Sequence, residues 1–179
     1  VIAFSSSTYG DHPGLPKEED QIGNPLSPYA VTKAAIEQFC QVFGSTYGME
    51  WIGLRYFNVF GPKQNPTNPY AAVIPIFAKA FLEKGEITVN GDGNTSRDFT
   101  YVDNVVEMNK LAMFTSNSSA LNQVYNTACN ERVSLNQMIG KLAEITGHKI
   151  KVTYGPERMG DVKHSLASIE KSKKLLGYK

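Results

Sequence analysis

The sequence predicts an α/β fold built around a parallel sheet. Short apolar runs at 1–4 and 51–56 alternate with longer stretches in which apolar residues recur every three or four positions, as at 36–43. Strands of a parallel sheet are covered by helices on both faces and therefore appear as continuous apolar runs. Alternation of such runs with helical patterns, without internal repeats, is typical of strand–helix–strand units.

The composition narrows the range of partners. The 179 residues are 41% hydrophobic and 20% charged, with a formal net charge of +1. This balance describes a globular protein and gives no support for binding to nucleic acid or to a membrane. The two cysteines and three histidines show no metal-ligand spacing, so no metal site is expected. The few thiols, and the lack of any apolar run near the roughly 20 residues of a membrane span, favour a cytoplasmic protein.

The first strand, 1–4, runs directly into hydroxyl residues at 5–8. The carboxyl ends of parallel strands form the edge at which open α/β sheets bind ligands. These hydroxyls are therefore candidate ligand contacts. A loop rich in turn residues follows at 11–25.

The next segment carries clear signals for a helix over 28–47. Ser27 suits the N-cap, Pro28 suits the first helical position, and Gly48 suits the end. The apolar stripe at 36–43 predicts a face packed in the core or in a subunit interface.

Tyr29 and Lys33 lie four residues apart on this helix, so their side chains share one face. A free phenol has a pKa near 10, and a neighbouring ammonium favours the phenolate, which can take and return a proton. By itself the pair is more typical of an ordinary surface helix.

The remaining elements follow from the same patterns. A loop with three prolines at 61–70 is expected to be functional or mobile, and Gly91-Asp92-Gly93 is expected to form a tight turn. Strands are predicted at 51–56, 87–90, 124–127 and 149–154, and helices at 71–84, 102–115, 135–146 and 169–176.

A strand-end serine followed by Tyr29 and Lys33 resembles the catalytic triad of the extended short-chain dehydrogenase/reductase family. Further motifs of that family follow in order: Leu-Arg-Tyr-Phe-Asn-Val-Phe-Gly-Pro at 54–62, Gly-Asp-Gly before Arg-Asp-Phe at 91–99, and Tyr-Val-Asp-Asn-Val at 101–105. Several ordered motifs are far more specific than one, and the resemblance covers almost the whole chain.

The resemblance implies the carboxyl-side part of a Rossmann-type doubly wound sheet with a small α/β substrate lobe. Residues 1–60 would form part of the dinucleotide-binding domain. Residues 61–179 would form mainly the substrate lobe, with elements at about 100–130 returning to the Rossmann sheet.

The chain also resembles only part of such an enzyme. Val1 opens inside an apolar strand, and no glycine-rich dinucleotide fingerprint follows any predicted strand. In the resembled family that fingerprint lies upstream of the catalytic serine. We therefore expect a carboxyl-side fragment that is inactive by itself, and a nucleotide-sugar-binding module without activity is the alternative.

In this family the serine orients a sugar hydroxyl, the tyrosine removes its proton, and the lysine holds the nicotinamide ribose. The resemblance thus implies catalytic roles for Ser5, Ser6, Tyr29 and Lys33, with NAD as cofactor. It also places Phe57 beside the nicotinamide. The run of three serines leaves the register open, with Ser7 as a residue that satisfies only backbone groups.

The substrate lobe of the resembled enzymes binds a UDP-sugar. Matching arginines there hold the diphosphate, which suits the planar fork of arginine. By this resemblance the substrate-binding residues, besides the two serines, are Asn58, Ala72, Val73, Asn90, Arg97, Arg158 and Asp161. Asn58 would touch the nucleotide sugar, Ala72 and Val73 would cradle the uridine opposite Asn90, and Asp161 would bind the ribose.

The strand end also distinguishes between reactions. Dehydratases of the family carry Thr-Asp-Glu there, whereas this chain has no carboxylate before Asp11. We therefore expect NAD-dependent 4-epimerisation of a UDP-hexose. Segments 23–33 and 70–75 resemble the bacterial UDP-N-acetylglucosamine 4-epimerases that serve polysaccharide biosynthesis. UDP-glucose and UDP-uronic acid epimerases remain alternatives, and the intact enzyme is expected to be a homodimer.

Overall fold

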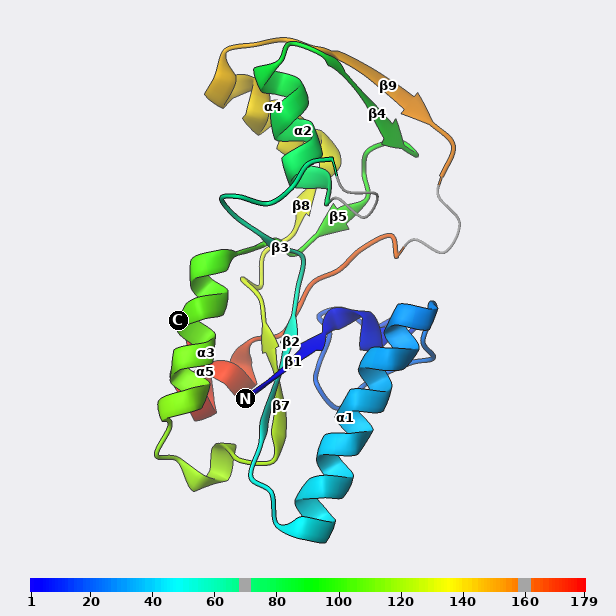
Figure 1. Cartoon of the computed structure of the whole chain (residues 1–179). Coiled ribbons are helices and arrows are strands. Elements are labelled where there is room, and N and C mark those ends of the chain that lie inside the picture. The colour runs from blue at the N-terminus through cyan, green and yellow to red at the C-terminus, as the bar shows by residue number, and fades with distance from the viewer. Residues whose placement is uncertain (68–71, 158–161) are drawn as a thin grey trace. The chain divides into compact units, whose positions relative to one another are not determined.

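The computed structural model describes residues 1–67, 72–157 and 162–179. The chain divides into two compact units (Figure 1). Unit 1 comprises Val1–Val59, Asp98–Glu131 and Ser165–Lys179, and unit 2 comprises Phe60–Arg97 and Arg132–His164.

Unit 1 contains a parallel sheet of three strands in the order β1-β2-β7. The strands are β1 (Ile2–Ser5), β2 (Ile52–Tyr56) and β7 (Gln123–Thr127). Helix α1 (Pro28–Tyr47) covers one face of the sheet, and α3 (Val102–Phe114) and α5 (Glu170–Leu176) cover the other (Figure 1). The predicted α/β class, with a parallel sheet covered on both faces, is therefore confirmed.

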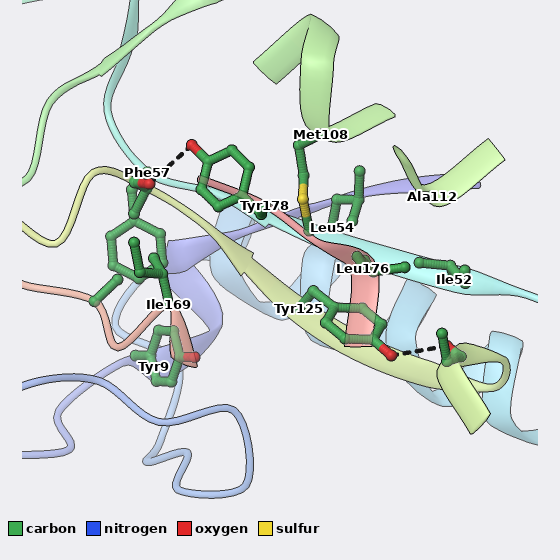
Figure 2. Packing of buried hydrophobic residues seen from close by; sticks show 13 residues of the cluster. Tyr9, Ile52, Leu54, Phe57, Met108, Ala112, Tyr125, Ile169, Leu176 and Tyr178 are labelled. Carbon is green, nitrogen blue, oxygen red and sulfur yellow. Dashed lines mark hydrogen bonds between the residues drawn. The ribbon is translucent and has the colours of Figure 1, made fainter. Parts of the chain in front are cut away.

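Each face of this sheet has its own hydrophobic core. The larger cluster lies under α3 and α5 and includes Leu54, Met108, Tyr125 and Leu176 (Figure 2). The two core hydroxyls drawn in Figure 2 with dashed lines are satisfied, because Tyr125 and Tyr178 each donate to a backbone carbonyl at 2.9 Å.

The smaller cluster lies on the α1 side and contains Phe4, Cys40, Trp51 and Val124. Gly53 is required here, because a Cβ at this position would lie 1.9 Å from the Phe4 ring.

The packing of α5 explains one difference from the expected domain division. Ile169, Leu176 and Tyr178 all belong to the larger cluster of unit 1. The sequence assigns 165–179 to the substrate lobe, whereas the structure places this segment in unit 1. A short terminal helix carries no sequence signal that says which core it joins.

The signals at the ends of α1 act as predicted. The Ser27 side chain accepts a hydrogen bond from Ala30 N at 3.1 Å, and Pro28 occupies the first turn. Gly48 ends the helix with a left-handed φ of 68°.

Unit 2 packs two helices beside short strands. Its elements are α2 (Val73–Leu82), β4 (Glu86–Asn90), β5 (Ser96–Arg97), β8 (Val133–Ser134), α4 (Leu135–Thr146) and β9 (Lys151–Gly155). Strands β4 and β9 pair in parallel, and β5 and β8 pair antiparallel. The N-terminus of α4 carries a capping box between Ser134 and Gln137.

Several very short elements have no counterpart in the sequence prediction. They are β3 (Val59–Phe60), β5, β6 (Thr100–Tyr101), β8, and the 3-10 turns η1 (Ser6–Tyr9) and η2 (Ser118–Ala120). Segments this short show no measurable hydrophobic period. Across the described ranges, no helix combines the length and apolar content needed to cross a membrane.

Candidate active site

The hydroxyls after β1 are engaged in different ways. The Ser5 side chain accepts a hydrogen bond from Ser7 N at 3.2 Å, and Thr8 Oγ1 donates to Ser5 O at 2.8 Å. Ser6 is half-buried. Ser7 Oγ is buried and has no hydrogen-bond partner among the described residues. The side chain that satisfies a backbone group is therefore that of Ser5, not that of Ser7.

Lys33 connects the tyrosine to the serine strand. Its Nζ lies 5.8 Å from the centre of the Tyr29 ring and donates to Ala3 O at 3.2 Å. Ala3 precedes Ser5 by two residues on β1, and Tyr29 is 56% exposed. The predicted shared face of the tyrosine and the lysine is confirmed, and the ammonium is held against the strand that ends in the candidate serines.

Phe57 is buried directly after the carboxyl end of β2. The ring is fully buried and packs against Tyr9 with ring centres 5.8 Å apart (Figure 2). The expected place of this ring beside a nicotinamide stays a prediction. The chain turns directly after Phe57, at Asn58, whose φ of 35° is left-handed.

The Asn58 side chain is held by unit 1 itself. Its Nδ2 donates to Asp98 O at 2.8 Å and to Ser165 Oγ at 3.2 Å. Its backbone carbonyl accepts from Thr100 N at 3.3 Å. Because the amide nitrogen is engaged in this way, a ligand contact of the side chain would use Oδ1 as an acceptor.

Asp98 is an organising residue that our reading of the sequence did not identify. Its carboxylate is fully buried and accepts from Cys129 N at 2.9 Å and Ala167 N at 3.1 Å. Burial raises its pKa, while the backbone hydrogen bonds oppose that rise. The carboxylate thus fixes two chain segments near Asn58, and the signal was present in the Arg-Asp-Phe motif.

Arg97 is one of two candidate diphosphate residues in unit 2. Its Nη1 donates to Ser96 O at 3.0 Å and Lys163 O at 3.2 Å. Lys163 O also accepts from Ser96 N at 3.0 Å, and His164 Nδ1 lies 2.8 Å from Ser96 Oγ. Backbone carbonyls therefore anchor the guanidinium on one side.

The structure describes three of the other candidate substrate residues. Ala72 is the N-cap residue of α2, Val73 begins that helix, and both are half-buried. Asn90 is exposed at the end of β4. Arg158 and Asp161 lie outside the described residues. Among the residues that are described, no group of three or more His, Cys, Asp and Glu side chains could hold a metal ion.

Comparison with known proteins identifies the family. The profile of the NAD dependent epimerase/dehydratase family matches residues 1–128. The chain belongs to this family. The family inferred from the ordered motifs is therefore confirmed.

Similar members of the epimerase/dehydratase family have several substrates in their names. An uncharacterized UDP-glucose epimerase of Bacillus subtilis (strain 168) is 32% identical over 99% of this chain and 54% of its own length. A UDP-N-acetylglucosamine 4-epimerase from Methanobrevibacter ruminantium M1, solved with UDP-N-acetylmuramic acid, is 39% identical with a TM-score of 0.93. The match covers 100% of this chain and 56% of that one.

A UDP-glucuronic acid 4-epimerase from Bacillus cereus, solved with UDP-glucuronic acid and NAD, is also similar. It is 33% identical with a TM-score of 0.90, and the match covers 99% of this chain and 55% of that one. The chain thus spans about half the length of the epimerase/dehydratase family members that it matches.

Proposed function

We propose that the whole protein containing this chain is an NAD-dependent 4-epimerase of UDP-hexoses. The main support for this proposal is the position of Lys33, whose ammonium bridges the Tyr29 ring and the backbone of β1 just before Ser5. An exposed tyrosine beside a fixed cation at the carboxyl edge of a parallel sheet suits proton transfer to and from a sugar hydroxyl. The similar UDP-sugar 4-epimerases support the same reaction.

In this mechanism Tyr29 takes the proton of the 4-hydroxyl and later returns it, and Lys33 favours the phenolate through its charge. Ser5 and Ser6 orient the sugar. NAD, when bound, supplies the acceptor and donor of the hydride at carbon 4. The buried Ser7 hydroxyl, which lacks a partner within the described part of the chain, fits an edge that receives polar ligand groups.

The residues that follow β1 also argue against a dehydratase, which eliminates water from the sugar. Elimination of water needs an acid near the sugar, and Asp11 is the first carboxylate after β1. Its oxygens accept from Asn24 N at 2.7 Å and Asn24 Nδ2 at 3.1 Å. These hydrogen bonds lower the pKa of Asp11, so the group stays ionised and fixed in its loop.

We assign the UDP end to unit 2 and Asn58. Arg97 and Arg158 would bind the diphosphate, Ala72, Val73 and Asn90 the uridine, and Asp161 the ribose. For the sugar, the motifs at 23–33 and 70–75 favour UDP-N-acetylglucosamine and UDP-N-acetylgalactosamine, with UDP-glucose and UDP-uronic acids as alternatives.

We further propose that the whole protein is a homodimer that uses α1. Several apolar side chains of this helix are exposed, and the rings of Phe43 and Tyr47 contact each other at 5.4 Å. A second copy would bury this apolar face.

The test is to incubate the whole protein with NAD and either UDP-N-acetylglucosamine or UDP-glucose, and to resolve the products by NMR. Interconversion of the 4-epimers is expected, with the N-acetylated sugar preferred. A 4,6-dehydrated keto sugar would contradict the epimerase proposal. Turnover of UDP-glucose alone would contradict only the preference for the N-acetyl group.

A further inference from the structure

A buried ion pair joins α1 to the central strand of unit 1. Arg55 Nε donates to Glu37 Oε1 at 2.9 Å, and Arg55 Nη2 donates to Glu37 Oε2 at 2.7 Å. The two side chains are only 3% and 7% exposed. This parallel, two-point geometry is the most directional contact that two charged side chains make.

Arg55 Nη1 and the face of the guanidinium also have partners. Its Nη1 donates to Glu19 O at 2.8 Å, and its guanidinium carbon lies 4.8 Å from the centre of the Tyr9 ring. Tyr9 OH in turn donates to Asn126 Oδ1 at 2.6 Å, and Asn126 N donates to Glu19 Oε1 at 2.9 Å. The pair therefore connects η1, the following loop, α1, β2 and β7.

Electrostatics favour the charged guanidinium of Arg55 and the neutral phenol of Tyr9. Burial opposes the charge of Arg55, but the interactions with its neighbours, the hydrogen bonds to Glu37 first among them, raise the pKa of the guanidinium. Burial raises the pKa of Tyr9 to about 12, so its phenol remains a neutral donor. Burial also raises the pKa of Glu19.

Stability alone does not account for such a pair. Desolvation of two buried charges offsets most of their attraction, and apolar residues of similar volume often serve as well or better. Apolar packing, however, allows a helix to slide or rotate slightly, whereas a planar two-point contact does not.

The pair lies in line with the candidate catalytic residues. Glu37 follows Lys33 by one helical turn and Tyr29 by two, on the same face of α1. Arg55 is aligned with Phe4 in the sheet register, and Phe4 precedes Ser5. Glu37 thus holds one end of this row of three side chains to β2, and Lys33 holds its middle to β1.

We infer that Glu37 and Arg55 are positioning residues that set where Tyr29 and Lys33 stand relative to the serines at the end of β1. This inference rests on the proposed epimerase function. A displacement of about 1 Å at a reacting group can reduce a rate by roughly 100-fold. Loss of the pair should therefore reduce kcat more than it changes the KM for the UDP-sugar.

The test uses Glu37→Gln and the double variant Glu37→Leu/Arg55→Met in the whole protein. We expect kcat to fall at least tenfold, with KM changed less than threefold, at temperatures well below unfolding. The double variant leaves no buried charge without a partner, so it remains informative if Glu37→Gln fails to fold. Glu86→Gln, which removes an exposed ion pair in unit 2, is the matched control and should change neither parameter.

The pH profile separates positioning from simple charge removal. Deleting the negative charge of Glu37 would by itself favour the phenolate of the base and move the rise of kcat/KM to lower pH. Displacement of Lys33 would remove a cation from the base and move that rise to higher pH. We expect the shift to higher pH in Glu37→Gln.

A wild-type kcat in the variants, or a shift to lower pH, would overturn the inference while leaving the proposed function intact. A wild-type protein that makes no 4-epimer would instead overturn the proposed function.

Discussion

Units 1 and 2 hold their candidate site residues by different means. In unit 1 the supporting groups are buried: the Glu37–Arg55 pair, the Asp98 carboxylate and Asn126 are almost or fully inaccessible. In unit 2 the supports of Arg97 are backbone carbonyls, and the ion pairs are mostly exposed.

This difference suits different tasks. In the proposed function the candidate residues of unit 1 transfer a proton, which tolerates little displacement between base, cation and substrate and therefore favours directional, desolvated supports. In the same proposal the half-buried Arg97 of unit 2 binds a flexible diphosphate, which tolerates small shifts of the guanidinium. The comparison therefore predicts that substitutions in unit 1 alter rate or stability, and substitutions in unit 2 alter affinity.

The largest expected effect is that of Tyr29→Phe in the whole protein. Removal of the hydroxyl abolishes proton transfer and should lower kcat by roughly 10²–10⁴-fold, while the retained ring keeps UDP-sugar binding near wild type. Steady-state kinetics and calorimetric titration with the UDP-sugar measure the two effects. Tyr47→Phe, at an exposed tyrosine of the same helix, is the control; it keeps the ring of the proposed dimer face and should change neither rate nor affinity. Affinity falling in step with rate would make Tyr29 a binding residue.

Asp98→Asn should destabilise the protein without altering its affinity for UDP. The amide has one acceptor oxygen in place of two, so either Cys129 N or Ala167 N loses its buried partner. An unsatisfied buried group costs roughly 1–3 kcal/mol. Thermal and denaturant unfolding of the whole protein measures this loss. An unchanged unfolding free energy would show that unit 1 does not depend on this carboxylate.

Arg97→Ala, at the adjacent position, should show the opposite behaviour. A charge-assisted hydrogen bond to the diphosphate contributes roughly 1.5–3 kcal/mol, so the affinity for UDP should fall about 10- to 100-fold. Unfolding should be nearly unchanged. Calorimetric titration with UDP measures the affinity, and Arg132→Ala, an exposed arginine of the same unit, is the control. Arg158→Ala should weaken UDP binding in the same way, and wild-type affinity in either variant would remove that arginine from the site.

The sequence predicted the features of the site that depend on local signals. The caps and apolar period of α1 fixed the shared face of Tyr29 and Lys33, and the apolar run of β1 placed the serines at a strand end. The left-handed turn at Asn58, directly after Phe57, is not visible in a strand pattern.

The buried polar partners were missed for a different reason. Glu37 lies within the apolar stripe of α1, and Arg55 lies within an apolar strand. Each position indicates that a charge is buried, but it does not identify the partner of that charge, which lies 18 residues away. Likewise, Asp98 bonds to backbone groups more than 30 residues away, which no local period encodes.

The smallest expected effect concerns the exposed pair of Glu86 and Lys151, which joins β4 and β9 at 3.0 Å with side chains 66% and 69% exposed. Water screens such a pair, and holding two long side chains in one geometry costs rotamer entropy. A double-mutant cycle with Glu86→Gln and Lys151→Gln should therefore give a coupling of at most about 1 kcal/mol, and less in high salt. The neighbouring hydroxyls of Thr88 and Thr153, 3.1 Å apart, remain to hold the strands together. A coupling well above that value, or one insensitive to salt, would show that unit 2 relies on charge pairs as unit 1 does, and the contrast between the units would fail.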